Sequence, residues 1–252
     1  MQIMRSIESI NPRYRSVFTR LTVHHVATFE NLLDLIRNEQ ATHPDISVFI
    51  TLDDLGQALY TSMHATESDE LEIVTDDLDF LGDTRAEEAR ELRQFAHTSA
   101  QLAAPGLRRT WADLRGTREG TAETVDALVA MNDNPVEVLD DVILVMHVPA
   151  DDETAAIAAV PNGYFSDDWN IFENHAVAQH LANGYGYRPL GIGASWIGFV
   201  REAPLAAPDA KRLVADLTEI YGAPEAPGWE SLGAVLTRQA TLFLGYTDGF
   251  EE

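Results

Sequence analysis

The chain has 252 residues, 41 of them acidic and 17 basic, and its formal net charge is −24. A charge of this sign and size argues against nonspecific binding to nucleic acid or to an anionic membrane. The hydrophobic content of 45% is too high for a disordered chain, and the absence of cysteine excludes disulfides, thiolate metal ligands and cysteine nucleophiles.

Strands and helices alternate in the first half of the predicted structure. Apolar and β-branched runs predict the strands, and apolar residues at spacings of three and four predict the helices. Thr84 and Glu87 have the spacing of a capping box, which places a helix start at Thr84. In chain order, the expected elements are a strand at 15–27, a helix between 28 and 44, a strand at 46–51, a helix at 52–63, a strand at 71–75 and a helix at 84–104.

The segment from Pro105 to Gly120 predicts a connection between two domains. It contains a Pro-Gly pair, two further glycines and four arginines, which are typical of a loop. We therefore expect domains at 1–110 and 121–252. The expected fold class is α+β, with two mixed α/β lobes that each contain a small sheet flanked by helices.

The second half continues the alternation. Its most apolar run, Val142 to Val148, predicts a buried strand. In chain order, the expected elements are a helix at 121–131, a strand at 142–148, a short helix at 151–160, an aromatic loop at 161–170, a helix at 173–183, a strand at 190–200, helices at 208–221 and 230–238, and a strand at 241–246.

Charge is distributed in blocks along the chain. Asp53 to Asp83 holds ten acids and no lysine or arginine, and Glu119 to Glu173 holds thirteen acids. Seven arginines lie between these two blocks, and no lysine or arginine follows them until Arg188. The blocks indicate either a solvated surface with internal ion pairs or an acidic face that attracts a basic partner.

Motifs for metals, cofactors and nucleophiles are incomplete. The acidic run that begins at Asp77 has Leu81 where a calcium loop needs an oxygen ligand. His175 and His180 are five residues apart, so one helix cannot direct both at one ion. Ser195 lacks the glycine that a nucleophile elbow requires two residues later. The sequence therefore predicts no metal and no cofactor, and only a metal site assembled from distant segments stays open.

The aromatic loop at 161–170 and the residues that follow it are the best candidates for a binding site. Aromatic side chains with a few polar groups are typical of ligand pockets and of interface anchors. The alternative is that these rings fill the core beneath the loop. The candidate binding residues are Tyr164, Asp168, Trp169, Asn170, His175, Tyr185 and Trp196.

Pro149, the pair Trp169-Asn170, His175 and the pair Tyr185-Gly186 together resemble the pattern of an uncharacterised bacterial family, domain of unknown function 4253. The resemblance covers Val142 to Asp248 and implies a shared scaffold without naming a reaction. The chain differs at polar and aromatic signature positions of the family, which here carry Ser195, Gly198, the segment 222–225 and the segment 244–248.

Taken together, the sequence predicts a non-enzymatic cytoplasmic binding protein whose acidic and aromatic surface recognises a basic protein. An immunity-type or inhibitor role is a special case, and neither nucleic acid nor membrane is expected as a partner. The first twenty residues predict no signal peptide. One alternative is a hydrolase that uses two of His147, His175, Asp168 and Glu173 in one cleft. Another is a nucleic-acid mimic, which needs a continuous acidic stripe.

Overall fold

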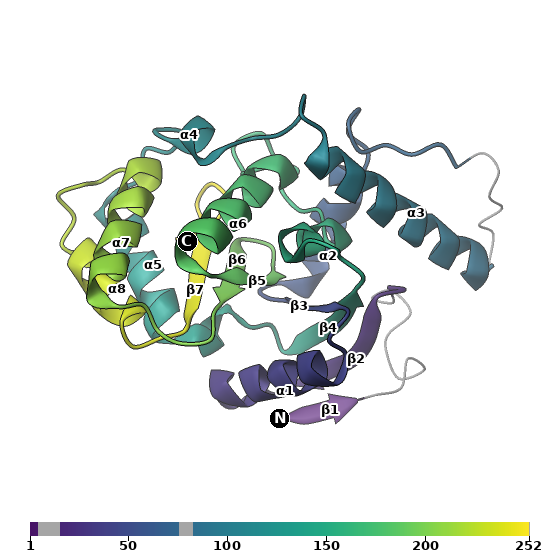
Figure 1. Ribbon diagram of the computed structural model, residues 1–252, viewed down its shortest axis with the longest axis horizontal. Helices are drawn as coiled ribbons and strands as arrows, with labels where there is room; N and C mark the ends of the chain where they lie inside the picture. Colours follow the sequence, from purple (N-terminus) through teal and green to yellow (C-terminus); the bar gives the residue numbers. More distant parts are fainter. Residues whose placement is uncertain (5–15, 76–82, 252) are drawn as a thin grey trace.

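The computed structural model describes residues 1–4, 16–75 and 83–251. In this part of the chain, seven strands form one mixed sheet in the order β1-β2-β4-β3-β5-β6-β7 (Figure 1). The β3–β5 pair is parallel, and the other pairs are antiparallel. The strands are β1 (Gln2–Met4), β2 (Thr19–His24), β3 (Ser47–Thr51), β4 (Val142–Val148), β5 (Arg188–Ile192), β6 (Trp196–Val200) and β7 (Thr241–Gly245).

The α+β class is confirmed, but the two small sheets expected from the sequence are one sheet. Strand β4 belongs to the second half of the chain and lies between β2 and β3 of the first half. Its residues Ile143 to Met146 are at most 1% exposed, because neighbouring strands pair with both of its edges and side chains cover both faces. The segment 105–120 is therefore not a division between two sheets.

Helices cover the sheet and extend beyond both of its ends. In Figure 1, α5, α7 and α8 gather beside β7, α6 crosses in front of the sheet and α3 lies at the far side. No helix in the described residues is long and apolar enough to cross a membrane. The helices are α1 (Phe29–Thr42), α2 (Leu55–Ala65), α3 (Thr84–Ala103), α4 (Trp111–Leu114), α5 (Ala122–Asp133), α6 (Ile171–Tyr185), α7 (Ala207–Tyr221) and α8 (Gly228–Leu236), with 3-10 turns η3 (Pro135–Val138) and η4 (Glu153–Ala159).

Three local predictions were wrong. The strand expected at 190–200 is a hairpin of β5 and β6, because the chain turns at Gly193, where the carboxylate of Asp53 occupies the space that a side chain would need. Residues 71–75 form no strand. Helix α3 is capped by Asp83, which accepts from the backbone N–H of Arg85 at 2.9 Å, and not by Thr84. The calcium-like segment lies mainly outside the described residues.

The outer edge of β7 is completed by a side chain. The amide of Asn132 on α5 donates to the carbonyl of Phe243 and accepts from its backbone N–H, both at 2.8 Å. Asn132 is 1% exposed, so these bonds are shielded from water. An open strand edge invites pairing with another chain, and Asn132 closes this edge at its centre.

Candidate functional site

A cleft of about 930 Å³ opens between the end of α2, the connector before α5, the loop before α6 and the end of the chain. Its volume lies within the range of known ligand sites. Four of the seven residues predicted as binding residues line it: Tyr164, Asp168, Trp169 and Asn170. The structure therefore brings the aromatic loop into contact with segments that are remote from it in the sequence.

Arg118 holds one wall of the cleft together. Its guanidinium lies 4.8 Å from the centre of the Trp169 ring and donates to the carbonyl of Thr247 at 2.9 Å and to that of Tyr246. The backbone N–H of Trp169 donates to the same Tyr246 carbonyl at 2.8 Å. Trp169 is 3% exposed. It therefore acts as a packed wall that positions the chain end, and its ring is not a free contact surface.

Asp168 joins the aromatic loop to the end of the chain. Its carboxylate accepts from the backbone N–H of Asp248 at 3.2 Å, and its own N–H donates to the carbonyl of Phe165 at 3.1 Å. Burial raises the pKa of Asp168, while the nearby Arg118 opposes that rise. This carboxyl is half-buried and structural, so the exposed acids around it are better placed to meet a ligand.

Acidic side chains dominate the lining of the cleft. Among the residues that the structure describes, the arginines of the lining are Arg109 and Arg118, and Arg118 is already engaged with two carbonyls and a ring. Eight carboxylates of the same described residues outnumber them and favour a positively charged ligand. These carboxylates belong to Glu67, Glu70, Glu119, Asp167, Asp168, Glu173, Asp248 and Glu251.

Four aromatic rings lie in edge-on or tilted contact at the cleft, and we name Tyr60, His64, Tyr164 and Phe165 the aromatic ladder; all but Tyr60 line the cleft. Successive ring centres lie 4.4, 5.2 and 5.3 Å apart. Tyr60, Tyr164 and Phe165 are 51%, 49% and 53% exposed, although rings of this size are usually covered. Together with Met63, they make up four of the eight exposed large hydrophobic side chains among the described residues. An exposed apolar cluster of this kind is typical of an interaction surface.

The sequence reasoning missed two members of the aromatic ladder. Tyr60 and His64 lie on α2, about a hundred residues before the aromatic loop, and only the fold brings them to Tyr164. The sequence feature that could have identified them is their spacing of four residues, which places both side chains on one helix face. Met63 is the last of the apolar residues whose spacing of three and four predicts the helix at 52–63, yet its side chain is 48% exposed.

The other predicted binding residues support the framework. Asn170 lines the cleft but caps α6, where it accepts from the N–H groups of Phe172 and Glu173 at 2.9 and 3.1 Å. His175 is buried on α6, with its Nε2 3.1 Å from the hydroxyl of Thr154. Trp196 packs edge-on against Phe250, with ring centres 5.0 Å apart. Neither His175 nor Trp196 lines the cleft.

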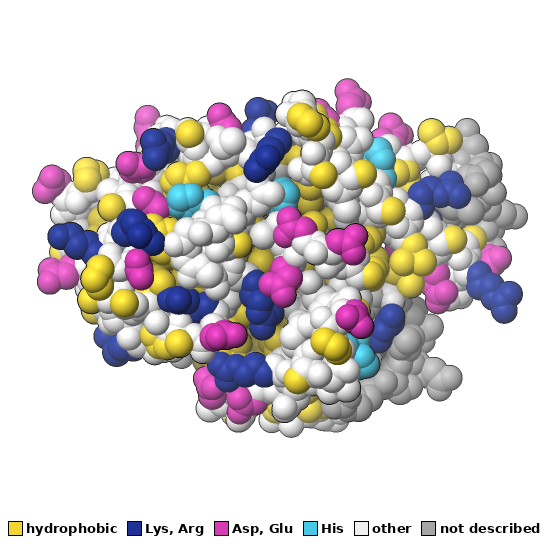
Figure 2. Space-filling view, in the orientation of Figure 1, with side chains coloured by type: hydrophobic (Ala, Val, Ile, Leu, Met, Phe, Trp, Pro, Cys, Tyr) yellow, Lys and Arg dark blue, Asp and Glu magenta, His cyan; other side chains and the backbone are white. Residues whose placement is uncertain are grey.

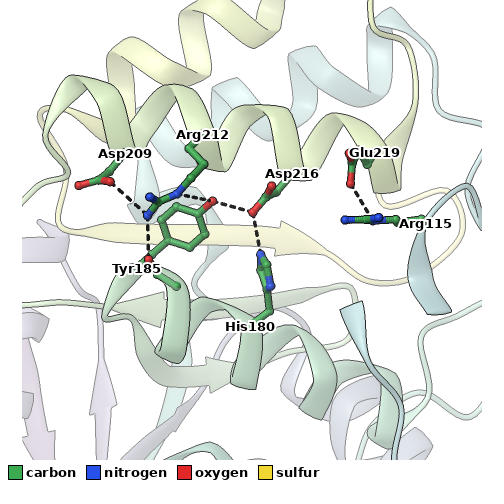
Figure 3. Close-up of polar contacts among 8 residues, drawn as sticks. Arg115, His180, Tyr185, Asp209, Arg212, Asp216 and Glu219 are labelled. Atoms are coloured by element: carbon green, nitrogen blue, oxygen red, sulfur yellow. Dashed lines mark hydrogen bonds and ion pairs between the residues drawn. The ribbon is translucent and has the colours of Figure 1, made fainter. Parts of the chain in front are cut away.

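Tyr185 belongs to a polar cluster between α6 and α7 (Figure 3). Its hydroxyl donates to the carboxylate of Asp216 at 2.6 Å, and His180 contacts the same oxygen at 2.7 Å. The guanidinium of Arg212 lies over the Tyr185 ring, 4.8 Å from its centre. Burial and the Asp216 bond raise the pKa of Tyr185 to about 12, so the phenol is a donor at neutral pH. Trp111 on α4 stacks on His180 at 3.9 Å. The cluster fastens α4, α6 and α7 to one another.

The four groups named for a hydrolase lie in three places. Asp168 and Glu173 line the cleft, while His175 contacts Thr154 beneath η4. His147 lies on β4, 3.3 Å from Glu39 of α1, and His43 completes a group whose ligand atoms could hold a metal ion. Only the two carboxylates of the predicted acid–base set therefore share a cleft.

No protein-family model matches the chain, and no curated protein or solved structure matches it either. The resemblance of residues 142–248 to family 4253 thus stays a prediction.

Proposed function

We propose that this protein binds a basic segment of a partner protein in the acidic cleft, with the aromatic ladder as the contact surface at its rim. The observation that carries the proposal is the combination of eight carboxylates in the cleft and three half-exposed rings beside them. Carboxylates attract the positive charge, and ring faces accept the stem and head of an arginine or lysine side chain.

Charge sets both the rate and the selectivity of such binding. An acidic cleft steers a basic partner by long-range attraction, and salt screens that attraction. Inhibition of a basic toxin or nuclease, as an immunity protein does, is a special case of the same chemistry. Binding by charge attraction predicts that the affinity for the partner falls steeply as the salt concentration rises.

Two features favour this reading over the alternatives. Figure 2 shows one face of the molecule, on which acidic side chains are interspersed with basic ones, whereas a nucleic-acid mimic needs a continuous acidic stripe. For a hydrolase, the cleft holds carboxylates from the predicted set, but His147 and His175 lie elsewhere.

A selection from a random peptide library displayed on phage tests the proposal. The full chain is the bait at low salt, and parallel selections use the variant Tyr164→Ser/Phe165→Ser. We expect the wild type to enrich peptides that combine arginine or lysine with an aromatic residue, and the variant to lose that enrichment. Enrichment of acidic or purely apolar peptides by the wild type would overturn the proposal, as would identical selections by both proteins.

A further inference from the structure

Glu39, His43 and His147 meet at the end of α1. Glu39 lies in the last turn of this helix, and His43 is its C-cap residue. Residues four apart lie on the same helix face, so these two side chains point to the same side. The chain then enters β3, whose Val48 pairs with His147 of β4. One short connection thus brings a carboxylate and two imidazoles from separate segments together.

The distances suit one small cation. One ligand atom from each residue can be chosen so that all three lie within 4.8 Å of one another. The Nε2 of His147 is 3.3 Å from the Glu39 carboxylate, and the two imidazole ring centres are 4.7 Å apart. In tetrahedral zinc sites, with metal–ligand bonds of about 2.0–2.2 Å, neighbouring ligand atoms lie roughly 3.4 Å apart. The Glu39–His147 pair already has that separation.

A second observation points to a ligand at this place. The Nε2 of His147 is buried, and although it lies 3.3 Å from the Glu39 carboxylate, it makes no hydrogen bond of good geometry with any described residue. The His147 side chain is 10% exposed, so water does not replace the missing partner freely. Buried ring nitrogens are normally satisfied, and a metal ion beside Glu39 satisfies this one.

We infer that Glu39, His43 and His147 form a zinc site whose fourth position is filled by water. Two imidazoles and one carboxylate match the ligand preference of zinc, whereas calcium and magnesium need more oxygen ligands. His43 is exposed, which gives the ion a path from solvent. Three protein ligands with one open position are typical of zinc sites that bind a further molecule. The site is separate from the proposed binding cleft, because none of its three residues lines that cleft.

Isothermal titration calorimetry of the chelator-treated full chain with zinc chloride tests the site. We expect one zinc ion per chain, and a loss of affinity of at least about tenfold in His43→Ala, Glu39→Gln and His147→Asn. His97→Ala is the matched control, because His97 is a histidine on α3 outside the cluster. Cobalt chloride is a second probe, and it should give the visible absorption of tetrahedral cobalt in the wild type and in His97→Ala only.

His43→Ala decides the test, because its side chain is exposed and its loss leaves the core intact. Circular dichroism without metal should show that this variant melts as the wild type does, and that only the wild type gains thermal stability on addition of zinc. Wild-type zinc affinity in His43→Ala, or no stoichiometric binding by the wild type, would overturn the inference and leave Glu39 and His147 as an ordinary ion pair.

Discussion

The guanidinium of Arg118 lies 4.8 Å from the centre of the Trp169 ring and donates to the carbonyls of Tyr246 and Thr247. One side chain from the connector therefore joins the aromatic loop to the end of the chain. These three segments are far apart in the sequence and form the wall of the acidic cleft.

Replacement of Arg118 by alanine should lower the free energy of unfolding by about 2 kcal/mol, because charge-assisted bonds to two carbonyls are lost. Arg118→Lys should restore only part of the lost free energy of unfolding. An ammonium group cannot donate to both carbonyls with the planar geometry of a guanidinium and also stack on the ring. Urea unfolding, monitored by tryptophan fluorescence, measures the free energy of unfolding of both variants. Arg238→Ala is the control: its pair with Asp133 is exposed and should contribute less than about 1 kcal/mol. Equal losses in the two alanine variants would contradict this role of Arg118.

Asn132→Ala should lower the free energy of unfolding by about 2–4 kcal/mol, because it leaves the N–H and carbonyl of Phe243 unpaired at the edge of the sheet. We also expect the variant to aggregate at lower concentration, since the unpaired edge can pair with another chain whenever α5 separates from β7. Urea unfolding and light scattering measure these effects. Asn134→Ala removes an exposed amide that contacts Glu137 and should behave as the wild type. If both variants scatter light alike, Asn132 does not protect the edge.

Asp53 should make stability depend on pH. Burial raises its pKa from 3.8 to about 6, although the N–H groups of Ser195 and Trp196 donate to it. The folded state therefore holds the proton more tightly than the unfolded state does. The stability that Asp53 contributes is fully present below its unfolded pKa of 3.8 and is lost as the pH rises through about 6, a total change of roughly 3 kcal/mol.

The difference in unfolding free energy between the wild type and Asp53→Asn should therefore shrink by about 2–3 kcal/mol between pH 4 and pH 7. Urea unfolding at several pH values measures this difference, from which the titration of all other carboxylates cancels. Asp45→Asn, at an exposed position, should show no such trend. A constant difference for Asp53→Asn would mean that its carboxyl does not titrate in this range.

Tyr185 and Asp216 should be energetically coupled. A double-mutant cycle with Tyr185→Phe and Asp216→Ala should give a coupling of about 1–2 kcal/mol, because the hydroxyl donates to a carboxylate at 2.6 Å. The same cycle with Asp133→Ala in place of Asp216→Ala should give a coupling near zero. A coupling near zero for both cycles would show that the cluster between α6 and α7 is held by other contacts.

Local patterns were enough to predict most elements, but not their pairing. The apolar run that became β4 and the periodic residues that became α3 and α7 are local signals, and the structure confirms those elements. The insertion of β4 between β2 and β3 depends on contacts across more than ninety residues, which no local period records. The hairpin at Gly193 was missed for the same reason, since its cause is the approach of Asp53.

The candidate site shows the same limit. The aromatic loop was recognisable from its composition, and Tyr164, Asp168, Trp169 and Asn170 do line the cleft. The sequence could not separate the exposed ring of Tyr164 from the buried ring of Trp169, because burial depends on Arg118 and on the chain end. The net charge of −24 likewise did not show where a binding site lies, whereas the fold gathers eight carboxylates of the described residues from four separate segments around one cleft.

We propose that the cleft itself, and not the overall negative charge, binds a basic segment. Calorimetric titration with the most enriched basic peptide tests it on the wild type, on Asp167→Asn/Asp248→Asn, and on Glu225→Gln/Glu230→Gln. The last variant loses the same charge at exposed positions that do not line the cleft.

We expect the cleft variant to lose affinity by roughly tenfold or more, with a weaker dependence on salt, while the control variant binds as the wild type does. Equal losses in the two variants would contradict the account, because they would mean that the peptide responds only to net charge.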